Sequence, residues 1–138
     1  MLDEDNIRAI DKEKIKSSIR LWLPISITTY TLPRKMEMYM QDVLASFLTE
    51  CHQEHMESAL SYCLSELIIN AKKANTKRVY FTEKGLDIYN EADYNRGMEN
   101  FKSDTLDNID YYLQLQKKAG LYVRLVLQEY RDKIKIEI

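Results

Sequence analysis

Glycine, proline and cysteine are scarce in this chain of 138 residues, which contains 3 glycines, 2 prolines and 2 cysteines. Two cysteines cannot build a disulfide framework, and we predict that Cys51 and Cys63 are free, buried thiols. An enzyme domain that cradles phosphates in glycine-rich loops would normally contain more glycine. The low glycine content therefore argues against a complete phosphate-binding pocket within this chain.

Long apolar runs and an excess of one charge are also missing. No run approaches about 18 apolar residues, the length that a membrane span requires, and residues 1–16 lack the apolar core of a signal peptide. We therefore expect a cytoplasmic protein. The net charge is only -2, and without a dominant basic patch we do not expect nucleic-acid binding. A hydrophobic content of 45% fits one globular domain of this length.

The hydrophobic spacing predicts helices in the first half of the chain and a hairpin at its end. The expected order is an arm or short helix (1–18), extended segments (19–23 and 25–32), helices (34–51 and 54–75), a strand (78–82), a helix that Thr105 caps and Gly120 ends, and a closing β-hairpin (121–138). Such helices bury their apolar stripes on one face of a mixed or antiparallel sheet. The predicted fold class is α+β.

One segment of the second long helix combines groups that suit phosphate and metal binding. Its predicted core stripe consists of Leu60, Cys63, Leu64, Leu67, Ala71 and Ala74. Glu66, Asn70 and Lys73 are spaced i, i+4, i+7 and are expected on a stripe beside that core, facing one cleft. An amide oxygen can coordinate Mg²⁺, an ammonium can meet a phosphate, and a carboxylate can orient or deprotonate a water. The competing interpretation is that charged residues at this spacing are ordinary solvent-exposed side chains on a helix surface.

The run ELIINAKKAN at 66–75 resembles the N box of the histidine-kinase-like ATPase superfamily, the Bergerat fold, whose pattern is E-L-x-x-N-A-x-K-A/H. The resemblance implies an N box at 65–75, a catalytic role for Glu66 near the reacting phosphate, Mg²⁺ coordination by Asn70, and ATP phosphate binding by Asn70 and Lys73. It also implies that residues 19–138 form a partial ATPase domain of this family, a truncated sandwich with an insertion at about 84–120.

Two motifs of that family, D-x-G-x-G and G-x-G-x-x-G, do not occur in the chain. The resemblance therefore implies the N-terminal portion of an ATP-binding domain that is not competent by itself. Its parent would be a signalling kinase or ATPase using Mg-ATP. The alternative is a non-catalytic regulatory or assembly module that kept the fold and lost ATP binding. A sheet that ends at residue 138 would leave a strand edge open, and we expect a homodimer through that edge.

Two other groups of residues are weaker candidates for a functional site. Cys51, His52, His55 and Cys63 contain zinc-ligand types but no paired C-x-x-C spacing, so we expect no zinc site there. The second half of the chain is rich in tyrosines (Tyr89, Tyr94, Tyr111, Tyr112, Tyr122 and Tyr130). Such rings could stack on bases or on a protein partner, and we favour half-buried tyrosines or a subunit contact.

Overall fold

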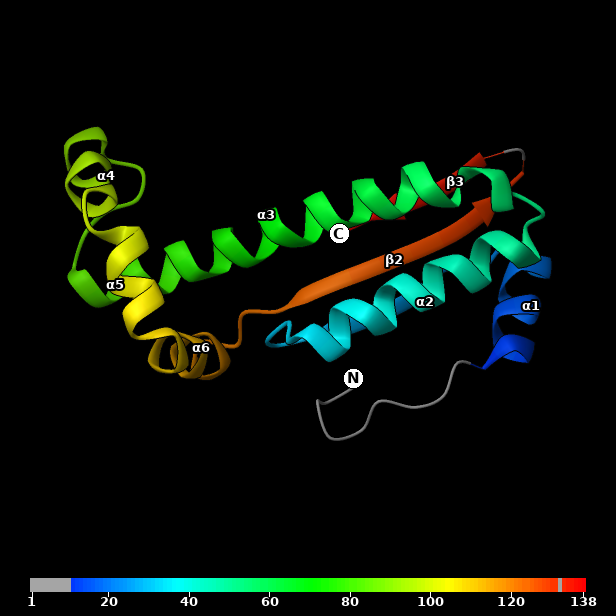
Figure 1. Ribbon diagram of the computed structural model, residues 1–138, viewed down its shortest axis with the longest axis horizontal. Helices are drawn as coiled ribbons and strands as arrows, with labels where there is room; N and C mark the ends of the chain where they lie inside the picture. Colours follow the sequence, from blue (N-terminus) through cyan, green and yellow to red (C-terminus); the bar gives the residue numbers. More distant parts are fainter. Residues whose placement is uncertain (1–10, 132) are drawn as a thin grey trace.

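The computed structural model describes residues 11–131 and 133–138, which form six α-helices and a three-stranded antiparallel sheet (Figure 1). The elements are α1 (Lys12–Arg20), β1 (Ile25–Thr29), α2 (Arg34–Glu50), the short 3₁₀ helix η2 (Glu54–Met56), α3 (Glu57–Lys84), α4 (Glu91–Met98), α5 (Phe101–Asp107), α6 (Ile109–Lys118), β2 (Val123–Tyr130) and β3 (Lys133–Glu137). Residues 1–10 of the predicted arm, and residue 132 of the predicted hairpin link, lie outside the described residues.

The sheet has the order β1-β2-β3, with β2 in the centre and antiparallel to both neighbours. Ile27 is opposite Leu125, and Leu127 is opposite Ile136, so apolar residues from all three strands share one face. The predicted hairpin at 121–138 is confirmed as β2 and β3, although β2 begins at Val123 rather than at residue 121.

Helices cover one face of this sheet, which confirms the predicted α+β class and makes the sheet antiparallel rather than mixed. The buried cluster unites α1, α2, the first half of α3 and the sheet: Ile15, Ile27, Leu32, Met36, Met40, Val43, Leu44, Phe47, Leu48, Leu64, Ile68, Val123, Leu125 and Leu127. The opposite face carries Arg124, Lys135 and Glu137, which are exposed. Such one-sided burial is typical of antiparallel sheets.

The prediction of an extended segment at 19–23 is wrong. Asp11 caps α1 by accepting a hydrogen bond from the Lys14 N–H at 3.1 Å, and α1 continues to Arg20. Ile15 and Ile19, four residues apart, both contact the main core, which favours a helix over an alternating strand. The three large residues that suggested the strand, Leu21, Trp22 and Leu23, are exposed. The next extended segment is confirmed in part by β1, and α2 agrees closely with the predicted helix at 34–51.

Helix α3 is much longer than the predicted helix at 54–75. It has 28 residues, about 42 Å of helix, and includes the 78–82 segment that was predicted to be a strand. Val79, Tyr80 and Phe81 favour strands by intrinsic propensity, but all three are buried in a second hydrophobic cluster. Tertiary packing therefore overrides propensity here, and the helix ends only at Gly85, whose φ is 68°.

The predicted insertion at about 84–120 contains α4, α5 and α6, which gather around the far end of α3 (Figure 1). Apolar residues of these helices and of the loops beside them complete the second cluster: Leu86, Ile88, Tyr94, Met98, Phe101, Tyr112, Leu115 and Leu121. Thr105 is not a helix cap as predicted, because it lies buried inside α5 and donates a hydrogen bond to the Phe101 carbonyl at 2.7 Å. Gly120, with φ of 69°, does follow the end of α6. Within the described residues, no helix is long and apolar enough to cross a membrane.

Candidate functional site

Glu66, Asn70 and Lys73 lie together on one exposed face of α3. At about 100° per residue, their directions fall within about 60° of one another, as the spacing predicts. The face is not beside the core, however. Leu64 and Ile68 are buried and point about 160° away from Glu66. The prediction that the three side chains adjoin the core and face a cleft is therefore wrong. They are exposed and project from the opposite side of the helix toward solvent.

The predicted core stripe is correct in part. Leu64 is buried and Leu60 and Ala71 are half-buried, whereas Cys63, Leu67 and Ala74 are exposed. Apolar residues occur in succession at 67–69, so the sequence alone allows more than one inward face. The actual stripe continues through Ile68, Asn75 and Val79.

Polar contacts with α2 fix this orientation of α3. The Lys72 ammonium lies 2.8 Å from Glu37 Oε1. The Gln41 amide donates to the Ser61 carbonyl and to Ser65 Oγ, both at 3.0 Å, and the Ser61 hydroxyl donates back to Gln41 Oε1 at 2.8 Å. Because Ser61, Ser65 and Lys72 face α2, the side of α3 that bears Glu66 faces outward.

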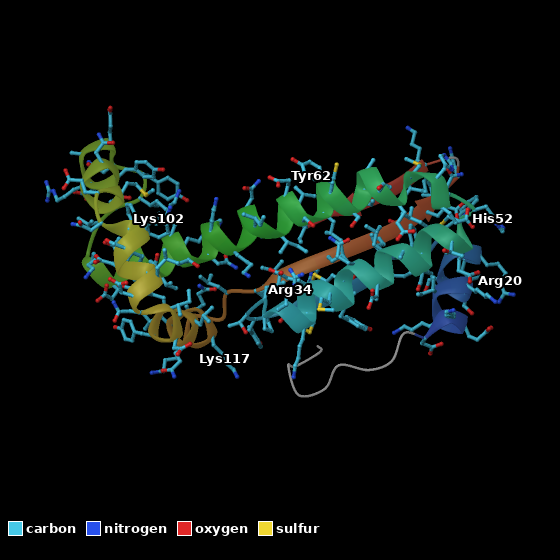
Figure 2. The ribbon with its side chains drawn as sticks, in the orientation of Figure 1. Arg20, Arg34, His52, Tyr62, Lys102 and Lys117 are labelled. Carbon is cyan, nitrogen blue, oxygen red and sulfur yellow. The ribbon has the colours of Figure 1, made fainter. Side chains whose placement is uncertain are left out.

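The outward face combines polar and apolar groups. Within the part of the chain that the structure describes, Glu66, Asn70 and Lys73 have no hydrogen-bond or ion-pair partner, so their oxygens and ammonium are accessible to a ligand. Tyr62, 68% exposed, lies on the same outer side of α3 (Figure 2), and Ile69 is also exposed. The face therefore offers a carboxylate, an amide and an amine beside apolar surface.

Asn75, the last residue of the N-box run, has a structural position that the sequence did not reveal. It is buried, its amide donates to the Tyr122 carbonyl at 3.2 Å, and its Oδ1 accepts from Arg78 Nη1 at 3.2 Å. Asn75 thereby ties α3 to the segment that leads from α6 into β2. The signal in the sequence was only its spacing of seven residues from Ile68, which places it on the inward stripe.

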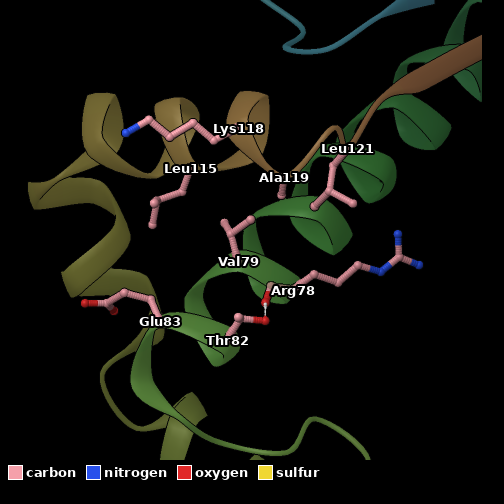
Figure 3. Close-up of a pocket in the computed structure, with 8 residues that line it drawn as sticks. All are labelled: Arg78, Val79, Thr82, Glu83, Leu115, Lys118, Ala119 and Leu121. Atoms are coloured by element: carbon pink, nitrogen blue, oxygen red, sulfur yellow. Dashed lines mark hydrogen bonds between the residues drawn. The ribbon is translucent and has the colours of Figure 1, made fainter.

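A cavity of about 450 Å³ lies between α3 and α6, away from the Glu66 face (Figure 3). Its lining comes from α3, the end of α6 and the link to β2: Arg78, Val79, Thr82, Glu83, Leu115, Lys118, Ala119 and Leu121. None of the predicted site residues contributes to it. This cavity could not be predicted from the sequence, because its two walls are about 40 residues apart in the chain.

The cysteines and histidines at positions 51, 52, 55 and 63 do not form a common site among the described residues. Cys51 is half-buried, and its thiol donates to Glu129 Oε2 at 3.2 Å. Burial, this hydrogen bond and the charges of Glu129 and Glu50 raise the pKa of the Cys51 thiol to about 12. Cys63 is exposed, so the prediction that both thiols are buried is wrong. Among the described residues no three His, Cys, Asp or Glu side chains converge as metal ligands.

Two buried tyrosines of the second cluster form hydrogen-bonded pairs with partly exposed carboxylates. The Tyr80 hydroxyl donates to Asp104 Oδ2 at 2.8 Å, and the Tyr112 hydroxyl donates to Glu83 Oε2 at 3.2 Å. Burial and these acidic partners raise the pKa of Tyr80 and that of Tyr112 to about 12 each. Tyr89 and Tyr130, in contrast, are exposed.

No protein-family model matches the chain, and no solved structure matches it. An uncharacterized protein of Treponema pallidum (strain Nichols) is 52% identical to it over 129 residues. The match covers 94% of this chain and 25% of the relative, so the chain spans about a quarter of the length of the protein that it matches. The similarity is therefore to one part of a longer protein.

Proposed function

We propose that this chain is the N-terminal portion of a histidine-kinase-like ATP-binding domain and supplies the residues that meet Mg²⁺ and phosphate. The observation that carries the proposal is the shared exposed face of Glu66, Asn70 and Lys73, which have no partners among the described residues and follow the N-box pattern. Residues that were only solvated charges would not need a poor helix former such as asparagine between them.

Each of the three side chains has a role that fits its chemistry. Asn70 offers an amide oxygen of the kind that completes the coordination of Mg²⁺, which keeps several waters and few protein ligands. Lys73 offers a point charge for a phosphate oxygen. Glu66 offers a carboxylate that can orient or deprotonate a water or hydroxyl beside the phosphate. The bound Mg²⁺ would neutralise phosphate charge.

In this proposal Glu66, Asn70 and Lys73 would meet the metal and the phosphate, while the described residues supply no wall for the adenine base. The exposed face of α3 has solvent rather than protein opposite Asn70. Much of the affinity for a nucleotide comes from burial of the base and from glycine-rich amides around the phosphates. We therefore expect this chain to bind Mg-ATP only at about millimolar concentration or more weakly. The parent protein, in this proposal, is a signalling kinase or ATPase.

A non-catalytic regulatory or assembly module is the second candidate, and one observation favours it. Tyr62, Leu67 and Ile69 are exposed on or beside the same side of α3. Large apolar side chains grouped on a surface are typical of protein contacts. In that case Glu66 and Lys73 would be the polar rim of a protein interface and would have no role with nucleotide.

Paramagnetic relaxation tests the proposal even when binding is weak. Substoichiometric Mn²⁺, added with excess ATP to the ¹⁵N-labelled chain, should broaden backbone signals around residues 66–73 before any others. Asn70→Ala should reduce that broadening severalfold. Gln114→Ala is the matched control, because Gln114 is also an exposed helical amide but lies on α6.

Broadening that is uniform, or that Asn70→Ala leaves unchanged, would contradict the role given to Asn70. If Mn²⁺ and ATP at about 10 mM cause no local broadening, the non-catalytic module becomes the better account. Micromolar binding of Mg-ATP by this chain, measured by calorimetry, would contradict the view that the pocket is incomplete.

A further inference from the structure

The cavity between α3 and α6 is suited to a ligand by size and lining. Its volume of about 450 Å³ is within the usual range for small-molecule sites. Val79, Leu115 and Leu121 surround its interior, and the aliphatic part of Arg78 continues this apolar wall (Figure 3). A tail of several methylene groups would replace water on these surfaces.

Positive charge exceeds negative charge at the margins of the cavity. The guanidinium of Arg78 and the ammonium of Lys118 extend to opposite sides (Figure 3). Glu83, the one acid of the lining, already accepts from the Tyr112 hydroxyl at 3.2 Å and lies 3.6 Å from the Lys84 ammonium. Within the described residues, Arg78 has no carboxylate partner. The Arg78 margin is therefore positive.

A hydrogen bond to Asn75 positions the Arg78 guanidinium. Its Nη1 donates to Asn75 Oδ1 at 3.2 Å, and Asn75 is itself buried and donates to the Tyr122 carbonyl. One such hydrogen bond uses a single N–H of the guanidinium and leaves others for an outside acceptor. A planar guanidinium with free donors is well matched to a carboxylate, which it can bind through two parallel hydrogen bonds.

We propose that this cavity binds a small amphipathic carboxylic acid, whose apolar tail lies against Val79, Leu115 and Leu121 and whose carboxylate pairs with Arg78. The site is separate from the Glu66 face and does not depend on nucleotide binding. Arg78 selects the carboxylate, and the apolar walls select a chain of several carbons over a small polar acid such as acetate.

Octanoate is a suitable probe for the full chain. Titration followed by ¹H–¹⁵N spectra should give saturable changes at Val79, Leu115 and Leu121, with a Kd of about millimolar or tighter. Octan-1-ol has the same tail length without the charge and should bind about fivefold or more weakly. Acetate should cause no saturable change.

Variants of Arg78 separate its charge from general packing. Arg78→Gln should weaken octanoate binding about three- to tenfold, while Arg78→Lys should retain most of the affinity. Lys117→Gln is the matched control, because Lys117 is an exposed cation of α6 outside the lining. Ala119→Phe should block the cavity, and since Ala119 is exposed this change fills space without removing a core contact.

Four results would overturn the proposal. Octanol binding as tightly as octanoate, or unchanged octanoate binding in Arg78→Gln, would mean that charge does not select the ligand. Unchanged binding in Ala119→Phe, with native far-ultraviolet circular dichroism, would place the ligand elsewhere. If about 10 mM octanoate causes no saturable change in the spectra, the cavity does not bind this class of ligand.

Discussion

Two cysteines in this chain have opposite surroundings. Burial and the contact with Glu129 raise the pKa of the Cys51 thiol to about 12, whereas Cys63 is exposed on α3 close to Glu66. The thiolate is the reactive form of cysteine. Cys51 therefore holds very little thiolate near neutral pH, and the two residues should differ in reactivity.

We predict that iodoacetamide at about pH 8 modifies Cys63 at least tenfold faster than Cys51. Mass spectrometry of the intact chain should show one adduct before the second appears. Cys63→Ser should remain almost unlabelled over the same period, and Cys51→Ser should label like the parent chain. Rapid labelling of Cys51 would contradict the contact with Glu129.

The tyrosine–carboxylate pairs predict a loss of stability in alkali. The pKa of Tyr112 is raised from 10.0 to about 12 in the folded chain, so the unfolded chain releases this proton first. Its contribution to stability is fully present below about pH 10 and is lost as the pH rises through the folded value. Tyr80 contributes in the same direction.

Tyr112→Phe should therefore lower the free energy of unfolding by about 1 kcal/mol at about pH 8, through loss of the hydrogen bond to Glu83. Between about pH 8 and pH 11, however, its stability should fall less than that of the parent chain. Urea unfolding followed by circular dichroism measures both effects. Tyr89→Phe is the control, because that side chain is 95% exposed. An equal fall in the parent chain and in Tyr112→Phe would disprove the link.

Among the helices, α4 depends on one close contact with α3. Gly97 is buried inside α4, and a Cβ there would lie 2.6 Å from Cζ of Phe81. Glycine usually costs a helix about 1 kcal/mol relative to alanine, so propensity alone favours the substitution. The Phe81 ring is buried against Tyr80 and Tyr94 and has little room to move.

Gly97→Ala is therefore expected to destabilise the chain by about 1–2 kcal/mol instead of stabilising it. Thermal unfolding of Gly97→Ala, Phe81→Leu and the double variant would form a double-mutant cycle. Because leucine lacks the atom that clashes, the double variant should be less destabilised than the sum of the single changes. Additive effects, or a stabilised Gly97→Ala, would show that α4 is not packed on Phe81 in this way.

Across the whole chain, α3 connects two hydrophobic clusters, and β3 forms one edge of the sheet. Within the described residues β3 pairs only with β2, so its outer edge is open. Open edges tend to pair with another chain. An antiparallel pairing of two copies of β3 centred on Ile136 would place Lys135 of one chain opposite Glu137 of the other, which is a favourable cross-strand pair.

We expect a weak homodimer through this edge. Sedimentation equilibrium should show association that Lys135→Glu weakens about threefold or more, because like charges then face each other. Adding Glu137→Lys should restore it. Hydrogen exchange should slow at residues 133–137 with rising concentration and stay unchanged in β1. A monomer at all concentrations, or a dimer insensitive to both changes, would exclude this interface.

Residue patterning alone predicts the elements whose hydrophobic period is unambiguous and whose partners are near in the chain. Helix α2 has one clear apolar stripe, and the alternation at 123–137 permits only a hairpin, so both were predicted correctly. It also placed Glu66, Asn70 and Lys73 on a common face, because the 3.6-residue repeat fixes relative directions within any helix.

The direction in which that face points depends instead on contacts between elements that are distant in the chain. Contacts of Lys72 with Glu37, and of Gln41 with Ser61 and Ser65, connect residues 20 to 35 positions apart and turn the face outward. Long-range burial likewise keeps residues 79–81 helical, since their neighbours in α5 and α6 lie about 20 to 35 positions later in the chain. The spacing of residues within one segment cannot predict such contacts, because they depend on how separate elements pack against one another in space.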